Sequence, residues 1–504
     1  MRMTQGFLPA SRELSKRYLR SLSDYRKIDR YDLLIIFGIS LYVSILSYLS
    51  ILKLNTFQSE YDLAVFNQAL WNTAMHGELL TNALEYGSHF SVHFSPILFT
   101  LVPIYGLFPE PVTLLIIQSI LLSLGAVPVY LCGREILGKE AGCIVGFSYL
   151  LYPSLHGVNL YDFHEIAFLP LLLGMAFWGF LSGRKNLVLI FGIMALLVKE
   201  DVSLLTGMMG LIGLYQTRTY SITDRWQYIV LLVLSFLSLS VFLLIIKPFF
   251  ASFGAGTAPE FLSQYVDPLN TVMKHNSYTI RLEYIIKSFA PLLFVPLLAP
   301  ELLLISGPSF IEILFSGGVF YSVWYHYSAL IIPGILFSTI LGLSRIQSRE
   351  ETFGKQIFRP ILLLMLISSI LCCLLYSPAV KQGELVGGFD EKALEKHREY
   401  VVQLISVLPF EASISTQINL LPYVSTHRTY WADYHDGADI ILLDNAFSWR
   451  SKDFRDDAER IQKNYVLLMN ENYVELYVNK LNPQLLSELR KTLQKENSRN
   501  TEMV

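Results

Sequence analysis

Long apolar runs recur along this chain, and they constrain its fold more than any other feature. Most of them extend for about 15 to 25 residues, close to the roughly 20 that a helix needs to cross the core of a bilayer. Only 16% of the residues are charged, against about 25% in a soluble domain. The first run, residues 32–52, is too long for the apolar core of a signal peptide and has no small-residue cleavage site behind it. The sequence therefore predicts an all-α polytopic membrane protein that retains its first run.

Basic residues between the runs predict the orientation. In residues 1–31, Lys and Arg outnumber Asp and Glu, so the positive-inside rule places this segment in the cytoplasm. With about eleven spans, each later basic cluster also falls inside and the C-terminus lies outside. The count includes two proline-rich segments, 283–299 and 300–316, but not residues 96–109, which we expect to be interfacial or re-entrant. If 96–109 does cross, one pair of short spans must be re-entrant instead. We expect a multi-pass protein of the plasma membrane.

The composition divides the chain into three parts. Residues 1–31 form a cytoplasmic basic segment, and residues 32–378 form a transmembrane domain with a long first outer loop at 55–95. Residues 379–504 form an extracytoplasmic α/β domain and tail, because charged residues become common there and apolar runs shorten. The strands expected in this last part cover 412–417, 438–444 and 465–469, and the helices cover 390–408, 451–463 and 483–496.

Signals for several other classes of protein are missing from the sequence. The four cysteines lie in or beside apolar runs and form no CxxC pair, so we expect neither a disulfide framework nor a cysteine metal site. There is no P-loop, no GxGxxG fingerprint and no internal repeat. Nothing in the chain indicates a nucleic acid as a partner.

Polar residues that are unusual so close to a membrane gather on the predicted outer side. Charged side chains near the bilayer are costly, and they therefore indicate function. The set comprises Glu60, Asp62, His89, His93, Asn159, Asp162, His164, Glu165, Lys199, Glu200, Asp201 and His326. Because they come from five separate connections, one shared pocket can hold them all.

The first outer loop supplies two pairs of candidates. Glu60 and Asp62 directly follow the first span, where one carboxylate can act as general base while the other binds a metal ion or orients an acceptor; an ordinary acidic loop is the alternative. The stretch also contains apolar residues at helical spacing, which favours an amphipathic helix in the plane of the interface. His89 and His93 would share one face of a helix, as two metal ligands or as a base and a phosphate donor. Histidines bonded to backbone or water are the alternative there.

The stretch NLYDFHE lies between two apolar runs and carries the next group. Asn159, Asp162, His164 and Glu165 can bind a divalent metal or an acceptor sugar. The alternative is a structural role in which this stretch pairs with Lys199.

Two later connections complete the set. Lys199, next to Glu200, interrupts an apolar hairpin and either neutralises a lipid phosphate or simply pairs with Glu200 or Asp162. His326 and Tyr327 lie in the stretch WYHY, where aromatic residues are expected at a membrane interface. The histidine is less expected there and is a candidate contact to phosphate or sugar.

Five stretches together resemble a known family. They are SEYDLAVFNQALW, HFSPILFTLVPIYGLFP, YPSLHGVNLYDFHE, LLVKED and WYHYSALIIP. They resemble a predicted-membrane-protein family, a domain-of-unknown-function family of bacteria and archaea that is grouped with the GT-C glycosyltransferases. The resemblance implies a fold of many helices, a polyprenyl-phosphate sugar donor and a catalytic acid in the first outer loop. That acid corresponds to Asp62, with Glu60 as its neighbour.

The sequence therefore predicts a membrane glycosyltransferase that uses a polyprenyl-phosphate-linked sugar, with Asp62 as general base and Lys199 or His326 near the phosphate. The acceptor can be a glycan, a lipid or a protein. A divalent metal ion remains an open question, because the loop lacks an Asp-Asp or Asp-Glu pair. A transporter or flippase is the main alternative, although such proteins often show internal repeats. A non-catalytic scaffold is the other, and it predicts that the outer charges pair among themselves without a pocket.

Overall fold

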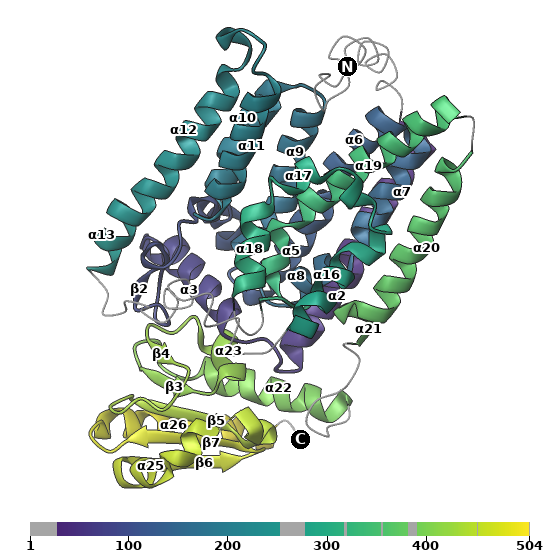
Figure 1. Ribbon diagram of the computed structural model, residues 1–504. Coiled ribbons are helices and arrows are strands. Elements are labelled where there is room, and N and C mark those ends of the chain that lie inside the picture. The colour runs from purple at the N-terminus through teal and green to yellow at the C-terminus, as the bar shows by residue number, and fades with distance from the viewer. Residues whose placement is uncertain are drawn as a thin grey trace.

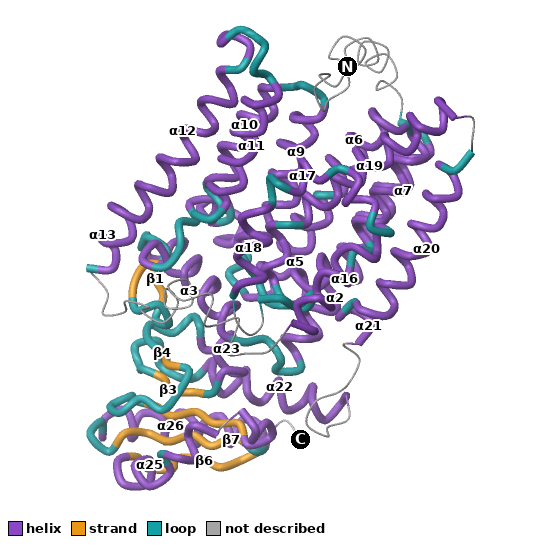
Figure 2. Tube along the Cα trace, viewed as in Figure 1, coloured by secondary structure: helices purple, strands orange, loops and turns teal. Residues whose placement is uncertain are grey.

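The computed structural model describes residues 28–252, 278–316, 320–353, 356–381, 391–450 and 452–502. Most of the predicted basic segment 1–31 and most of the predicted polar loop 251–281 lie outside the described residues. The described chain forms a helical bundle with a small sheet domain at one end (Figure 1). Among these residues, strands are confined to that domain and to one short hairpin beside it (Figure 2).

Among the described residues, four helices or helix pairs are long and apolar enough to cross a membrane. They are α2 (Arg30–Asn55), α5 with α6 (Pro111–Leu124 and Ala126–Leu137), α12 through α13 (Trp226–Val241 to Lys247–Ala251) and α20 (Phe358–Tyr376). The side chain of Asp29 caps α2 by accepting hydrogen bonds from the backbone N–H groups of Tyr31 and Asp32. All four segments coincide with predicted spans.

Further helices pack against these four. They are α7 (Lys139–Leu150), α8 (Pro153–Leu160), α9 (Leu169–Leu181), α10 (Lys185–Leu196), α11 (Val202–Gln216) and α19 (Ile332–Phe353). Gly157 in α8 lies directly against the backbone of Val323, and a Cβ atom there would collide with the Val323 carbonyl. This close approach brings the end of α8 next to the 3-10 turn η8 (His326–Leu330).

The proline-rich segments do not form the two continuous spans that the sequence predicted. α16 (Tyr278–Phe289) is followed by the 3-10 turns η6 (Ala290–Leu292) and η7 (Val295–Leu298), and then by α17 (Pro300–Leu303) and α18 (Gly307–Phe315). Prolines 291, 296 and 300 lack the backbone N–H that a continuous helix needs. Residues 96–109 contain only η2 (Pro96–Thr100) and α4 (Val102–Leu107), too short for one spanning helix.

The first outer loop folds into α3 (Tyr61–His76), the hairpin β1 (Thr81–Asn82) and β2 (Gly87–Ser88), and the 3-10 turn η1 (His89–Ser91). The prediction of an interfacial amphipathic helix is wrong for α3, because residues 63–70 are all buried. Leu63 and Phe66 belong to the core of the bundle, whereas Ala64 and Val65 belong to the core of the C-terminal domain.

The C-terminal domain is built on a mixed five-stranded sheet with the order β4-β3-β5-β7-β6. The strands are β3 (Ile414–Thr416), β4 (Tyr430–Trp431), β5 (Ile440–Asp444), β6 (Tyr465–Glu471) and β7 (Val474–Asn479). The helices are α22 (Glu391–Ser406), α23 (Leu421–Val424), α24 (Lys452–Asp456), α25 (Ala458–Asn464) and α26 (Pro483–Glu502). The three predicted strands and the predicted helices are present, whereas β4 and β7 were not predicted.

This domain is fixed to the first outer loop by hydrogen bonds between buried side chains. The Tyr430 hydroxyl donates to the carbonyl of Ala64 over 3.1 Å, and the amide of Asn67 donates to the Ser425 hydroxyl over 2.8 Å. Gln68 donates to the carbonyl of His427 over 2.7 Å. The sheet domain therefore packs against α3 of the first outer loop, the helix that carries the candidate catalytic acid.

Candidate active site

One cavity of about 930 Å³ collects most of the unusual polar residues. Its walls come from the first outer loop, from the connections before α9, α11 and α19, and from α12, α13 and α18. The sequence-predicted residues that line it are Asp62, His89, His93, His164, Glu165, Lys199, Glu200, Asp201, His326 and Tyr327. Three other predicted residues, Glu60, Asn159 and Asp162, are not part of its lining.

Asp62 lies in the first turn of α3, where the helix dipole favours a negative charge. Its side chain is 26% exposed, and a carboxylate oxygen lies 3.8 Å from Nε2 of His164. The hydroxyl of Tyr161 donates a hydrogen bond to the carboxylate. Burial raises the pKa of Asp62 above its ordinary value of 3.8, although the nearby His164 and the Tyr161 hydroxyl act in the opposite direction. A carboxylate with a raised pKa, open to a cavity, suits a general base.

Two histidines complete a cluster around Asp62. The rings of His164 and His326 lie 3.7 Å apart, centroid to centroid. Nδ1 of His164 donates to the carbonyl of Phe163 over 2.7 Å, which leaves Nε2 unprotonated in the neutral ring. Nδ1 of His326 is buried and has no hydrogen-bond partner among the described residues, and burial lowers the pKa of this histidine, which keeps the imidazole neutral.

Asp62, His164 and His326 can hold a metal ion. One potential ligand atom from each lies within 4.8 Å of the other two. Imidazole nitrogens and carboxylate oxygens are common ligands of divalent transition metals. The orphaned Nδ1 of His326 is the observation that makes the residues fit such an ion.

The connection that carries His164 is held by residues that the sequence analysis missed. Gln118 of α5 is fully buried, and its amide group donates to the carbonyls of Asn159 and Asp162 over 2.9 and 2.8 Å. Its amide oxygen accepts from the backbone N–H of His164 over 2.8 Å. A lone amide inside an apolar span was the available signal.

Asp162 forms an ion pair with a residue that the sequence analysis did not suggest as its partner. Its carboxylate lies 2.9 Å from the ammonium of Lys53 and accepts from the backbone N–H of Glu60 over 2.8 Å. The alternative pairing of Asp162 with Lys199 is therefore wrong. Asn159 is likewise turned into the protein, where its amide donates to Ser50 and Ser119.

His89 and His93 are each paired with a carboxylate. Nδ1 of His89 lies 2.9 Å from Glu85, and Nδ1 of His93 lies 2.7 Å from Glu200. Burial opposes the charge of His89, but Glu85 outweighs it and raises the pKa of the histidine. Burial likewise opposes ionisation of Glu200, whose pKa His93 nevertheless lowers to about 2. His89 begins a 3-10 turn rather than an α-helix. Its Nδ1 atom bonds within the loop, whereas Nδ1 of His93 joins the loop to the connection before α11.

Lys199 is surrounded by carboxylates. Its Nζ lies 3.6 Å from Asp201, not in an ion pair with Glu200 or Asp162. Burial lowers the pKa of Lys199, but Asp201, Glu165 and other acids outweigh it and raise the value above the ordinary one. Burial and nearby acids such as Glu312 raise the pKa of Asp201. The positive charge of Lys199 is thus largely offset by carboxylates of the protein itself.

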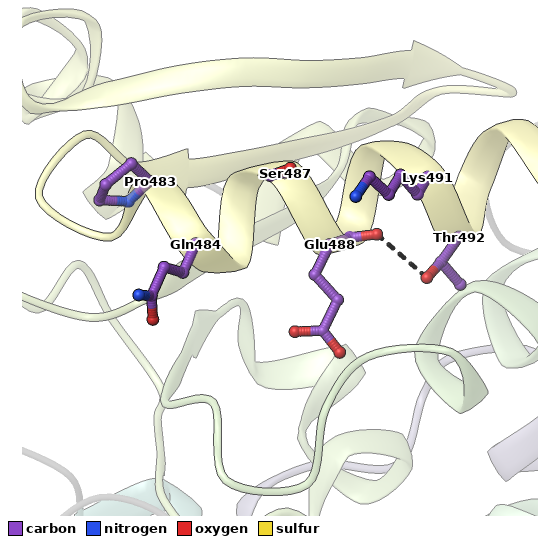
Figure 3. Close-up of a pocket in the computed structure, with 6 residues that line it drawn as sticks. All are labelled: Pro483, Gln484, Ser487, Glu488, Lys491 and Thr492. Atoms are coloured by element: carbon purple, nitrogen blue, oxygen red, sulfur yellow. Dashed lines mark hydrogen bonds between the residues drawn. The ribbon is translucent and has the colours of Figure 1, made fainter.

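A second hollow, along α26, has no comparable chemistry. Its lining consists of Pro483, Gln484, Ser487, Glu488, Lys491 and Thr492 (Figure 3). All six come from one face of a single helix, and the hydrogen bond drawn there joins Thr492 to the carbonyl of Glu488 within that helix. It is a surface groove of the sheet domain, far in the chain from Asp62.

The fold itself is similar to that of the GT-C glycosyltransferases. The crystal structure of ArnT from Cupriavidus metallidurans bound to undecaprenyl phosphate matches with a TM-score of 0.56 at 14% identity, over 88% of this chain and 98% of that one. ArnT in the apo state matches with a TM-score of 0.51 at 13% identity, over 88% and 97%. An oligosaccharyltransferase from Archaeoglobus fulgidus gives 0.44 at 14% identity, over 88% and 74%.

The chain belongs to the DUF2079 family of predicted membrane proteins, whose sequence profile matches residues 53–476. The resemblance inferred from the five stretches is therefore confirmed, and the protein is a membrane protein with a GT-C-like fold. No protein with a curated description matches the chain in sequence.

Proposed function

We propose that this protein is a membrane glycosyltransferase that moves a sugar from a polyprenyl-phosphate carrier to an acceptor at the extracytoplasmic face. The observation that carries the proposal is the cavity that joins Asp62 to an apolar wall with exposed side chains such as Leu243 and Ile311. A sugar-linked polyprenyl phosphate has an apolar and a polar part that match such a cavity. Its isoprenoid chain stays in lipid, and its sugar reaches water. The match to ArnT, solved with undecaprenyl phosphate, supports the same class of donor.

Asp62 acts as the general base in this proposal. Its carboxylate takes the proton of the acceptor hydroxyl as the acceptor oxygen attacks the anomeric carbon of the sugar. The bond between that carbon and the phosphate oxygen breaks, and the electron pair leaves with the polyprenyl phosphate. The raised pKa of Asp62 strengthens the carboxylate as a base.

A divalent metal ion, if one is used, would be held by Asp62, His164 and His326. Bound there, it would offset negative charge that develops on the leaving phosphate. His326 and Tyr327 line the same cavity, and in this proposal they contact the sugar or phosphate. The acceptor can be a glycan, a lipid or a protein.

The orientation belongs to the same proposal. With residues 1–31 in the cytoplasm, the first outer loop, the cavity and the sheet domain all lie outside, and 32–378 and 379–504 act as a catalytic and an accessory domain. The scaffold alternative predicted outer charges without a pocket, and the cavity argues against it. A transporter is separated from an enzyme by the experiment below.

The test is a screen of the purified protein against polyprenyl-phosphate sugars, with and without divalent ions. We expect Asp62→Asn to lower the rate of sugar transfer by about 10²- to 10⁴-fold, because a general base contributes that much. Glu110→Gln is the matched control, an exposed acid at the start of α5 that does not line the cavity, and it should keep the wild-type rate.

Two results would overturn the proposal. A folded Asp62→Asn protein with the wild-type transfer rate would remove Asp62 as base. A wild-type protein that releases no polyprenyl phosphate from any donor, yet moves lipid-linked sugars between leaflets of a vesicle, would be a flippase.

A further inference from the structure

The cavity is lined by two lysines whose surroundings differ sharply. Lys199 lies 3.6 Å from the Asp201 carboxylate and close to other acids. Lys247 forms no ion pair within 4.0 Å in the part of the chain that the structure describes, and its Nζ lies 6.0 Å from the centre of the Phe242 ring. Among the described residues, an anionic ligand entering the cavity therefore meets a positive charge without a paired carboxylate at Lys247, not at Lys199.

The helix that carries Lys247 is locally distorted. A π-helical turn, η5 (Phe242–Ile246), separates α12 from α13, and the N–H of Lys247 donates to the carbonyl of Phe242 five residues earlier. At the 100° per residue of an α-helix, Lys247 would be rotated by about 80° from Leu239. A π turn rotates less per residue, which brings Lys247 closer to the face of Leu239 and Leu243, and all three line the cavity. Such turns often occur at functional sites.

The same helix is the least buried of the four candidate spans. Only 17% of its most apolar window is buried, against 56% for α5 with α6. It stands at the edge of the bundle, with α18 on the inner side (Figure 1). Leu243 on this helix and Ile311 on α18 line the cavity although they are 48% and 62% exposed. The apolar wall is therefore open to the side of the molecule, where lipid lies.

The end of the helix is fixed to the first outer loop by aromatic contacts. The ring of Phe242 lies 6.2 Å from that of Phe94, and the ring of Phe250 lies 5.4 Å from that of Phe90. Lys247 is between these two contacts in the chain. Its backbone is thus held at the cavity wall while its ammonium group keeps the reach of a four-carbon side chain.

We propose that Lys247 binds the phosphate of an isoprenoid phosphate whose chain leaves the cavity between α12 and α18. Lys199 is then a structural cation that allows Asp201 and its neighbours to be buried. The identity of the ligand rests on the proposed function, but the assignment of the phosphate subsite to Lys247 does not depend on transfer. The charge, the π turn and the open apolar wall all meet at this residue.

The test is direct binding of undecaprenyl phosphate, undecaprenol and phosphatidylglycerol to the purified full chain in detergent. We expect Lys247→Gln to weaken binding of undecaprenyl phosphate by about tenfold or more, the loss of one charge-assisted contact. Binding of undecaprenol should be unchanged, and Lys247→Arg should restore most of the affinity. Lys287→Gln is the matched control, since Lys287 pairs with Glu283 outside the cavity.

Several results would overturn the subsite. One is a Lys247→Gln protein that binds undecaprenyl phosphate with wild-type affinity. Another is a Lys247→Gln protein that loses as much affinity for undecaprenol as for undecaprenyl phosphate. The third is a wild-type protein that binds phosphatidylglycerol as tightly as undecaprenyl phosphate. Because the readout is binding, the two proposals fail separately. Binding that depends on Lys247 in a protein without transfer activity would refute the enzyme alone, and transfer with unchanged binding in Lys247→Gln would refute the subsite alone.

Discussion

At the scale of single residues, the hydroxyl of Tyr161 sets how basic Asp62 is. It donates to the carboxylate and so favours the charged form, which lowers the pKa that burial raises. Only deprotonated Asp62 can accept a proton, so the transfer rate falls as the pH falls through this pKa.

Removing the hydroxyl should therefore move the acid limb of the pH profile. In Tyr161→Phe the charged form loses a donor, the pKa rises, and the limb shifts to higher pH by about half a unit to one unit. The measurement is kcat/KM for transfer against pH. Tyr325→Phe is the control, because its ring packs 4.9 Å from that of Tyr161 while it does not line the cavity. An unshifted limb in Tyr161→Phe would show that Asp62 does not control the rate.

At the scale of elements, α5 determines the shape of the connection between α8 and α9. The side chain of Gln118 bonds the backbone at Val158, Asn159, Asp162 and His164. These groups are buried, so each lost bond leaves a polar group that water cannot reach.

We expect Gln118→Leu to lose stability by about 2–4 kcal/mol and to lose transfer activity with it, although Gln118 does not line the cavity. Thermal unfolding and the transfer rate measure the two effects. Ser123→Ala on the same helix is the control, because the Ser123 hydroxyl donates within its own helix to Ile120. Equal unfolding temperatures for Gln118→Leu and the wild type would show that the connection is held by other contacts.

The sequence predicted elements well where one local property decides them. α2 and α20 were predicted because uniform apolarity over about 20 residues has few alternatives to a span. The segments 283–299 and 300–316 are also rich in apolar residues, but their prolines break the helices. Asp62, Lys199 and His326 were expected together because topology alone places them on one face. The Lys53–Asp162 pair and the Gln118 contacts were missed, since nothing local links residues about a hundred positions apart in the first case and about forty in the second.

At the scale of the whole molecule, the bundle and the sheet domain are not independent. α3 contributes Leu63 and Phe66 to one core and Ala64 and Val65 to the other. The composition changes near residue 380, but the hydrophobic core of the sheet domain reaches back to the first outer loop. The sheet domain and the helix that carries Asp62 therefore share a buried contact.

A charge placed on the shared face of α3 should therefore loosen the sheet domain more than 300 residues away in the chain. Ala64 is fully buried against the C-terminal core, and its carbonyl accepts from Tyr430. In Ala64→Asp a carboxylate would be buried there without a partner, which is strongly unfavourable. Hydrogen exchange should then become faster in β3 and β5, since local opening costs less free energy. Met75→Asp, at an exposed position of the same helix, should leave those strands protected. Unchanged protection of β3 and β5 in Ala64→Asp would mean that the sheet domain folds without the loop, and its contact with α3 would then be a docking surface rather than part of its core.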